Sequence, residues 1–364
     1  MTDIAGVQRL RPAATQLPVG WYIDPIVWEM EQRLIFDAGP RYVGHELMVP
    51  EPGDYRVVDT ARGAKVLVRN AERIELLSNV CRHRQAKMLS ASGNTGQIVC
   101  PVHRWTYDLS GRLLGAPKFP ESPCLDLERT ALTRWNGLLF ESGRDVIHDL
   151  AALSVIDDLN FDGYSFDHQL VEHYEVNWKT FIEVYLEDYH VAPCHPGLGR
   201  FVDCDNLHWE FGDWYSVQRV GVNEQLASPG TPVYSRWHDQ VLRYRAGNAP
   251  KYGAVWLTYY PNVMLEWYPH VLVVSSILPE GPERCTNVVE FYYPEEIACF
   301  EREFIQAERA AYLETAAEDR EICERMHAGR KALWRQGRNE VGPYHSPYED
   351  GMQHFHEFVQ RQLR

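Results

Sequence analysis

The spacing of hydrophobic residues changes along the chain, and each spacing predicts a different kind of element. Residues 20–38 place aromatic and aliphatic side chains at helical intervals, with Pro25 near the expected helix start. From Tyr55 to Gly143 the pattern changes to short runs of β-forming residues, such as YRVVD and AKVLVR, separated by Gly, Pro, Asn and Asp. This texture is typical of a small antiparallel β-domain.

The second half of the chain contains longer elements. Residues 143–164 indicate a connector with a short helix, and residues 176–191 a helix that ends before Pro193. Long apolar strands are expected within residues 254–292, followed by a long helix over residues 295–336. The order of elements predicts an α+β architecture, in which a β-domain precedes a domain that closes with a helix.

Composition narrows the expected partners. Lys and Arg number 36 against 51 Asp and Glu, so the formal net charge is −15, and no segment forms a basic stripe. Neither a nucleic-acid backbone nor an anionic membrane surface is therefore an expected partner. The N-terminus has no apolar signal-peptide core and no apolar run is long enough to span a membrane, which predicts a soluble, cytoplasmic protein. Eight cysteines in 364 residues are too few for a disulfide scaffold, so free or metal-bound thiols are expected.

The clearest chemical motif is a repeated pairing of Cys with His. Cys81 and His83 are followed, after sixteen residues, by Cys100 and His103. Zinc is one candidate, but zinc fingers usually take each pair of ligands from one residue type. Here each loop supplies one thiolate and one imidazole, which fits a cluster whose two irons are ligated differently, one by two Cys and the other by two His. The alternative is four unrelated polar residues near two turns.

A second constellation lies in the segment NWKTFIEVYLEDYHVAPCHPG. His190 and His195 are five residues apart with a helix break between them, so both imidazoles can converge on one metal ion. Glu187 lies one turn before His190, where a carboxylate can orient the imidazole ring. By spacing alone this pair is a weak signal, since most such histidines are surface or structural residues. A different face of the expected helix is predicted to pack into a core through Trp178, Phe181, Ile182, Tyr185 and Tyr189.

The long C-terminal helix offers a third ligand for a 2-His-1-carboxylate iron site. Most of its carboxylates, including Glu318 and Glu321, share a face with other charged residues and are expected in solvent. Asp319 instead shares a face with Tyr312 and Cys323, on the apolar stripe of the helix. Because a buried carboxylate must be paired, protonated or bound to metal, we expect Asp319 to complete the triad.

At this point the chain resembles a known family. CRHRQAKM and CPVHRWTYDLSGRL resemble the two loops of a Rieske [2Fe–2S] domain, without the additional loop cysteines of the respiratory-complex type. Together with WYIDPIVWEMEQRLIF, NWK…LEDYH…HP and the final acidic helix, they resemble the α subunit of Rieske non-haem iron oxygenases, the aromatic-ring-hydroxylating and choline-monooxygenase-like family. The resemblance implies an N-terminal helical segment (1–40) packing on the catalytic domain, an antiparallel β Rieske domain (41–150) and a helix-grip (START-like) α+β catalytic domain with one mononuclear iron (151–364).

The resemblance also assigns the Cys and His residues of the first motif. Cys81 and Cys100 would hold one iron of the cluster, and His83 and His103 the other. The soluble type of Rieske cluster found in oxygenases and ferredoxins is the one implied.

Further implications concern assembly and substrate. In a head-to-tail homotrimer, Glu187 would bridge His103 of one subunit to His190 of the next and carry the electron between them. Gln85 stands where relatives usually have Gly, a departure that can shift the cluster loop. Val184 stands where choline-oxidising relatives often have Asn, which leaves the substrate class open.

The implied function is the oxygenase component of a Rieske mono- or dioxygenase. It would use O2 at Fe(II) and electrons from a separate NAD(P)H-dependent reductase, since no convincing GxGxxG motif is found here. The substrate would be a small N-methyl or quaternary amine or an aromatic compound. The alternatives are a Rieske electron-transfer or redox-sensing protein with a non-catalytic helix-grip domain, and a zinc-binding structural module. Most of the strand aromatics are expected in the core and a few at a substrate pocket: Trp256, Tyr259, Tyr260, Trp267 and Tyr268.

Overall fold

The computed structural model of the chain describes residues 15–60, 63–223 and 230–364. It divides into two compact units. The small unit is Pro40–Ile147, and the large unit joins the described residues up to Gly39 to His148–Arg364. The first fourteen residues of the expected N-terminal segment lie outside the described residues. Residues of that segment and of the C-terminal domain thus share one unit, and the two units are described separately below.

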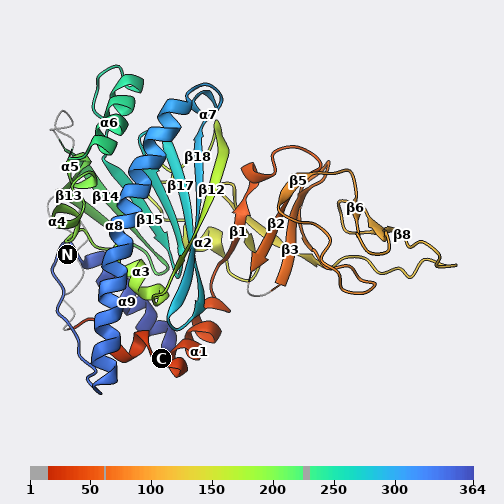
Figure 1. Ribbon diagram of the computed structural model, residues 1–364, viewed down its shortest axis with the longest axis horizontal. Coiled ribbons are helices and arrows are strands. Elements are labelled where there is room, and N and C mark those ends of the chain that lie inside the picture. The colour runs from red at the N-terminus through yellow and green to blue at the C-terminus, as the bar shows by residue number, and fades with distance from the viewer. Residues whose placement is uncertain (1–14, 61–62, 224–229) are drawn as a thin grey trace. The chain divides into compact units, whose positions relative to one another are not determined.

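The small unit consists of short antiparallel strands in three sheets, as the punctuated β-rich runs predicted (Figure 1). The sheets have the strand orders β1-β11-β10, β5-β2-β3-β4-β9 and β6-β7-β8. A short 3-10 turn, Glu46–Met48, follows the first strand. The strands are β1 (Arg41–His45), β2 (Asp54–Thr60), β3 (Gly63–Arg69), β4 (Ile74–Ser78), β5 (Ser92–Asn94), β6 (Ile98–Val99), β7 (Thr106–Tyr107), β8 (Leu113–Gly115), β9 (Arg129–Thr130), β10 (Leu132–Trp135) and β11 (Leu138–Glu141).

One of the cores of the small unit surrounds the cysteines of the first motif. Val66 and Val68 of β3 are fully buried and belong to the same cluster as Cys81, Cys100 and Trp105. Alternation along the strand puts Val66 and Val68 on one face, over which the cluster loops close, and Leu67 on the other face, in a separate core. The two thiols therefore lie in an apolar environment rather than on the surface.

The large unit is built on a seven-stranded antiparallel sheet, with a long helix across one face (Figure 1). Its strand order is β12-β18-β17-β16-β15-β14-β13. Central strands such as β15 are buried along their whole length, because the sheet is covered on both faces. This mixed architecture confirms the expected α+β class. The strands are β12 (Tyr164–Tyr174), β13 (Val202–Phe211), β14 (Tyr215–Val222), β15 (Ala254–Tyr259), β16 (Val263–Tyr268), β17 (Val271–Gly281) and β18 (Arg284–Pro294).

The long helix α8 packs against the sheet through one apolar stripe. Phe304 and Ala311 are buried in one cluster with Phe291 of β18, and the Tyr312 ring meets the Phe291 ring at 5.0 Å. The expected N-terminal helix and the long C-terminal helix are both confirmed, the latter broken at Glu301. The helices are α1 (Pro25–Glu31), α2 (Val146–Asp149), α3 (Trp178–Tyr185), α4 (Val191–Cys194), α5 (Leu198–Phe201), α6 (Pro232–Tyr244), α7 (Glu295–Phe300), α8 (Arg302–Arg335) and α9 (Asp350–Leu363), with a 3-10 turn at Val19–Tyr22 and a π turn at Gln32–Phe36.

The prediction of one helix over residues 176–191 was wrong. Helix α3 begins after an Asn177 cap and ends at Tyr185, and residues 186–190 are irregular. Pro193 does not stop a helix but lies inside the short α4, where its missing N–H costs nothing in a first turn. The backbone of the irregular segment forms a hydrogen bond with a distant part of the chain instead of within a helix: the Asp188 N–H donates to the Tyr348 carbonyl at 3.1 Å. Tyr189, expected in the core, is 58% exposed.

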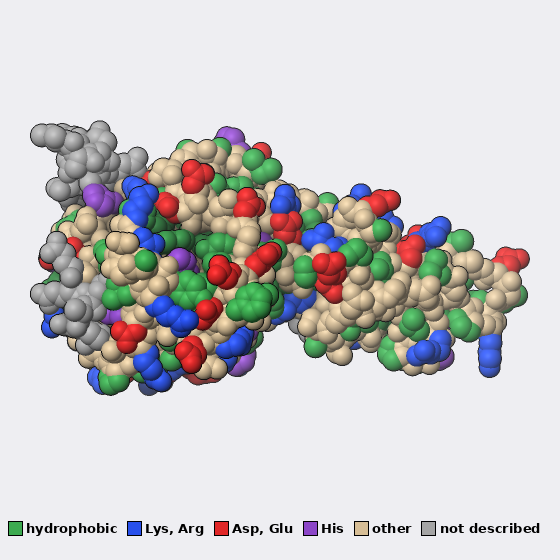
Figure 2. Space-filling view, turned by 90° about the horizontal axis from the view of Figure 1, so that it is seen from above, with side chains coloured by type: hydrophobic (Ala, Val, Ile, Leu, Met, Phe, Trp, Pro, Cys, Tyr) green, Lys and Arg blue, Asp and Glu red, His purple; other side chains and the backbone are tan. Residues whose placement is uncertain are grey.

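The surface carries charged side chains of both signs (Figure 2). On the face drawn in Figure 2, acidic and basic side chains are interspersed rather than gathered into a basic area. Within the described ranges, no helix is both long enough and apolar enough to cross a bilayer. All eight cysteines have free thiols, so none is used in a disulfide.

Candidate metal centres and active site

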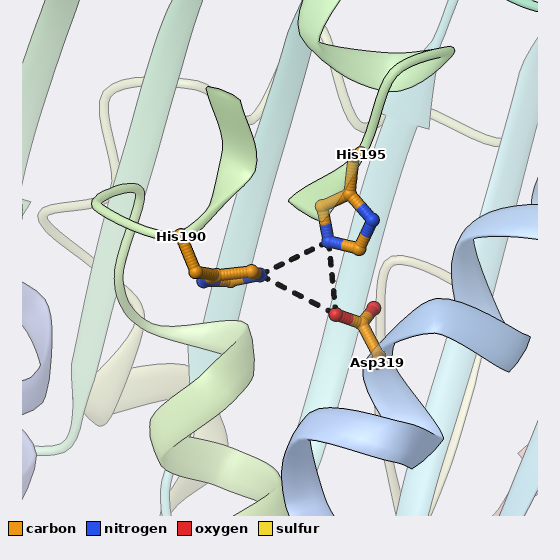
Figure 3. A group of neighbouring side chains, drawn as sticks. All are labelled: His190, His195 and Asp319. Carbon is orange, nitrogen blue, oxygen red and sulfur yellow. Dashed lines mark hydrogen bonds and ion pairs between the residues drawn. The ribbon is translucent and has the colours of Figure 1, made fainter. Parts of the chain in front are cut away.

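Two histidines and one aspartate converge at a point in the large unit (Figure 3). His190 is the last residue of the irregular segment after α3, His195 follows α4, and Asp319 projects from the middle of α8. The two Nε2 atoms are 3.0 Å apart, and Asp319 Oδ1 lies 3.3 Å from His190 Nε2 and 3.0 Å from His195 Nε2. The three ligand atoms all lie within 4.8 Å of one another, which is the arrangement that one metal ion requires.

Each imidazole is oriented by a second carboxylate. His190 Nδ1–H donates to Glu187 Oε1 at 2.5 Å, and His195 Nδ1–H donates to Glu318 Oε2 at 2.7 Å. Since an ionised carboxylate can only accept, the proton of each neutral ring is held on Nδ1. Both Nε2 lone pairs are then free to point toward Asp319, as metal-binding histidines require.

The residues fit a bound cation. Asp319 Oδ1 is buried and makes no hydrogen bond, although two Nε2 atoms lie close to it. Burial opposes protonation of His190, but the carboxylates of Asp319 and Glu187 outweigh it and raise the pKa of His190 to about 10. Burial likewise opposes ionisation of Asp319, yet the two imidazoles lower its pKa. Positive charge at this point, whether protons or a metal ion, is therefore favoured by its surroundings.

Glu318 was placed wrongly by the helical-face argument. It was expected on a solvated face, but its carboxylate contacts His195 and its side chain is 26% exposed, against 29% for Asp319. The two neighbours on α8 face the site together because His195 contacts both, Glu318 through Nδ1 at 2.7 Å and Asp319 through Nε2 at 3.0 Å. Periodicity alone does not show on which side of a helix the loop with His195 lies.

The two Cys/His loops of the small unit share one backbone design. Cys81 N–H donates to the Ala86 carbonyl at 2.9 Å, and Cys100 N–H donates to the Trp105 carbonyl at 2.8 Å. Gln85 and Arg104, each four residues after the Cys, have φ angles of 56° and 61°. Gln85 therefore adopts the left-handed conformation for which glycine is favoured, and the two loops keep equivalent backbones.

The side chains of these loops suit two metal ions better than one. Cys81 and Cys100 are buried, and the His83 and His103 rings lie side by side with centroids 4.6 Å apart. Ligands of one tetrahedral zinc lie about 3.3–3.8 Å from each other. In the described part of the chain, no three of these four residues form such a compact group. His83 Nδ1 is buried without a hydrogen bond, which leaves it available as a ligand.

Sequence reasoning missed two aromatic residues of the loops. Trp105 stacks on the His83 ring with centroids 5.0 Å apart and an interplanar angle of 4°. The Tyr107 hydroxyl lies 3.7 Å from Cys81 Sγ and accepts the Arg82 N–H at 3.2 Å. Both are aromatic residues that follow His103 directly in the β-rich run, and this closeness to a cluster ligand was the signal available in the sequence.

A cavity of about 110 Å³ adjoins the His–His–Asp group. Among the described residues that line it are five carboxylates and neither lysine nor arginine. Trp256 and Tyr268, two of the strand aromatics expected at a pocket, also line it, whereas Tyr259 and Tyr260 are buried outside it. The carboxylates are Glu187, Asp188, Glu266, Glu308 and Asp319.

Two of these carboxylates are buried and were not identified from sequence. Burial raises the pKa of Glu266 to about 7 and that of Glu308 to about 8. Glu266 lies on β16 and Glu308 near the start of α8. A glutamate in an otherwise apolar strand was the sequence signal for the first of them.

Comparison with known proteins places this geometry in a family. Residues 40–127 match the Rieske [2Fe–2S] domain, and residues 161–364 match the catalytic domain of the ring hydroxylating alpha subunit. The chain is 62% identical over 361 residues to a putrescine 2-hydroxylase of Ralstonia nicotianae, covering 99% of both chains. It is 26% identical to a chloroplastic choline monooxygenase of Beta vulgaris, covering 95% of this chain and 77% of the relative.

A solved structure shows the same fold. A quaternary ammonium Rieske monooxygenase superposes with a TM-score of 0.78 at 20% identity, covering 98% of this chain and 100% of that one. The catalytic-domain match alone spans more than half of the chain, and the Rieske match precedes it in the family's order. The chain therefore belongs to the α subunits of the Rieske non-haem iron oxygenases, enzymes whose cofactors are a Rieske [2Fe–2S] cluster and one mononuclear iron.

Proposed function

We propose that this oxygenase hydroxylates a short aliphatic diamine of the putrescine type. The observation that carries the proposal is the acidic cavity beside the His–His–Asp group, which is lined by carboxylates and, among its described residues, by neither lysine nor arginine. A diamine is doubly positive at neutral pH, so such a cavity attracts it and repels aromatic acids. The relative with 62% identity over the whole chain is named for putrescine as its substrate, which supports the same assignment.

The residues that hold the cofactors follow from the two constellations. We assign Cys81 and Cys100 to one iron of the cluster and His83 and His103 to the other. His190, His195 and Asp319 are assigned to the mononuclear iron, which activates O2 for insertion into a C–H bond when it is bound.

The surrounding residues prepare the site for this chemistry. Glu187 and Glu318 hold the Nδ1 protons of His190 and His195, so that both rings present Nε2. The Trp256 and Tyr268 rings form an apolar wall that limits water near the substrate. The buried carboxylates neutralise the ammonium groups and thereby orient the carbon chain.

Glu187 is also assigned a role between subunits. Its carboxylate already accepts from His190 and keeps 14% of its side chain exposed, so a second donor from outside the subunit can reach it. We propose a head-to-tail homotrimer in which that donor is His103 of the neighbouring subunit. The solved relative is described in terms of inter-subunit electron transfer, which supports this arrangement. The electrons would come from a separate NAD(P)H-dependent reductase.

Product analysis tests the proposed function. Purified enzyme supplied with NAD(P)H and a surrogate reductase is expected to convert putrescine to a monohydroxylated diamine, with choline and an aromatic acid as comparison substrates. Asp319→Ala should keep the visible spectrum of the cluster but lose mononuclear iron and product. Turnover of choline or the aromatic acid with putrescine unchanged would contradict the substrate class. Full mononuclear iron in Asp319→Ala would contradict the ligand assignment.

A further inference from the structure

Glu266 is a buried anion whose hydrogen bonds hold it in the cavity. It is 2% exposed and lines the cavity beside Trp256, its cross-strand partner on β15. The Tyr268 hydroxyl donates to Glu266 Oε2 at 2.8 Å, and the Ser275 hydroxyl donates to Oε1 at 3.3 Å. Trp256 Nε1–H donates to the Tyr268 oxygen at 2.9 Å, so the Tyr268 proton is directed at Glu266. Both carboxylate oxygens are therefore acceptors, each with a lone pair left for another donor.

Glu308 is a second buried carboxyl group in the same cavity. It is 4% exposed, and Tyr293 donates its hydroxyl proton to Oε2 at 2.5 Å. Within the described residues, neither Glu266 nor Glu308 forms an ion pair with Lys, Arg or His. Burial alone favours the protonated form of both groups, so a cation bound in this cavity would stabilise their ionised forms.

Both carboxyl groups line the same cavity as the residues of the His–His–Asp group. Glu308 and Asp319 are eleven residues apart on α8, which is about 16 Å along the helix axis. Glu266 lies on β16 and lines the same cavity as both of them. The nitrogens of extended putrescine are about 6 Å apart, because five bonds of about 1.5 Å separate them. A substrate with a reacting carbon beside Asp319 therefore has its far ammonium group within the same cavity, whose lining includes Glu266.

We propose that Glu266 binds the ammonium group that points away from the metal, and that Glu308 supplies a second negative charge behind it. This assignment rests on the proposed function and adds the residues that select the substrate. A primary ammonium group has N–H donors for the free lone pairs of Glu266, whereas a trimethylammonium group has none. The pair therefore favours a primary diamine over choline-like quaternary amines.

Substrate binding to the iron-loaded enzyme tests this assignment. Calorimetry without O2 should show that Glu266→Gln binds putrescine at least tenfold more weakly than wild type, with a smaller loss for choline. In steady-state assays the change should appear mainly in KM. Glu308→Gln should weaken putrescine binding at least threefold. Glu266→Asp, which keeps the charge, should recover part of the affinity.

Glu290→Gln is the matched control. Glu290 is also a buried strand glutamate that accepts a tyrosine hydroxyl two residues on, from Tyr292 at 2.9 Å, but it does not line the cavity. The Glu290→Gln variant should bind putrescine within twofold of wild type, and all variants should keep the cluster spectrum and iron content.

Putrescine binding by Glu266→Gln within twofold of wild type would overturn the inference while leaving the proposed function intact. If Glu266→Gln does not fold, putrescine binding by Glu308→Gln within twofold of wild type would overturn it. No putrescine binding by the wild type would overturn the proposed function as well.

Discussion

His195 is the most buried residue of the His–His–Asp group, with a side chain only 1% exposed. A ring in that position can rotate only if its Nδ1 proton loses the Glu318 carboxylate, at a cost typical of a charge-assisted hydrogen bond. Carboxylates that accept from metal-binding histidines fix the tautomer and raise the basicity of the ring. Glu318 is therefore a positioning residue for the metal site, a role that its place among charged neighbours on α8 concealed.

Replacing Glu318 tests this role. Glu318→Ala should lower the affinity for mononuclear iron by about 10- to 100-fold, because His195 loses the acceptor that orients it. Iron content after dialysis against graded chelator concentrations measures the effect. Glu321→Ala is the control, since Glu321 is 65% exposed and forms an ion pair with Arg325 one turn away. Equal iron affinity in both variants would show that His195 is held by packing alone.

At the scale of elements, the irregular segment between α3 and α4 decides where Glu187 and His190 lie. The segment is held from outside its own helix: Asp188 bonds to the Tyr348 carbonyl, and the Tyr189 ring stacks on His345 with centroids 4.7 Å apart. Gly351 at the start of α9 permits this approach, because a Cβ there would lie 2.9 Å from the Leu186 carbonyl oxygen and closer still to the Trp209 ring. The C-terminal region thus positions a metal ligand that is distant in sequence.

A methyl group at Gly351 should displace that segment. Gly351→Ala is expected to lower the free energy of unfolding by about 1–3 kcal/mol through overpacking, and to reduce mononuclear iron while the cluster is retained. Denaturant unfolding and metal analysis check both effects. Gly329→Ala in α8 is the comparison, because nothing lies within 4 Å of a Cβ there and alanine should stabilise that helix by about 0.5–1 kcal/mol. Unchanged iron content in Gly351→Ala would show that α9 does not support the ligand segment.

At the scale of the whole molecule, the proposed trimer makes Glu187 the connection between two metal centres. It contributes to one subunit by orienting His190, and its exposed edge is available to a partner. An oxygenase with this connection transfers an electron over a short bonded path, and without it must rely on a longer path through space.

Glu187→Gln should separate these roles. The amide oxygen can still accept from His190, so cluster, iron and trimer should be retained, while the negative charge that favours a second His donor is lost. Cluster oxidation after single-turnover mixing with O2 and putrescine is expected to slow by orders of magnitude, followed by stopped-flow absorbance. A rate within about twofold of wild type, equivalent to about 0.4 kcal/mol, would place the electron path elsewhere.

The sequence by itself determined the features that depend on neighbours along the chain. The β-rich texture of the small unit, the strands within residues 254–292 and the apolar stripe of α8 follow from periodicity, which is a local property. The same holds for the Cys-x-His and Cys-x2-His loops, and for the spacing of His190 and His195. These patterns specify which residues share a face or a turn, and the structure brings His190, His195 and Asp319 together.

Only the tertiary structure decided what lies opposite each face. The end of α3 depends on a backbone bond to Tyr348, and the role of Glu318 depends on the side from which His195 approaches. Glu266 and Glu308 belong to different elements and become one acidic cavity only when α8 crosses the sheet. The physical reason is that hydrogen bonds and charges act through space over a few ångströms, whereas these partners are separated by tens to hundreds of residues along the chain.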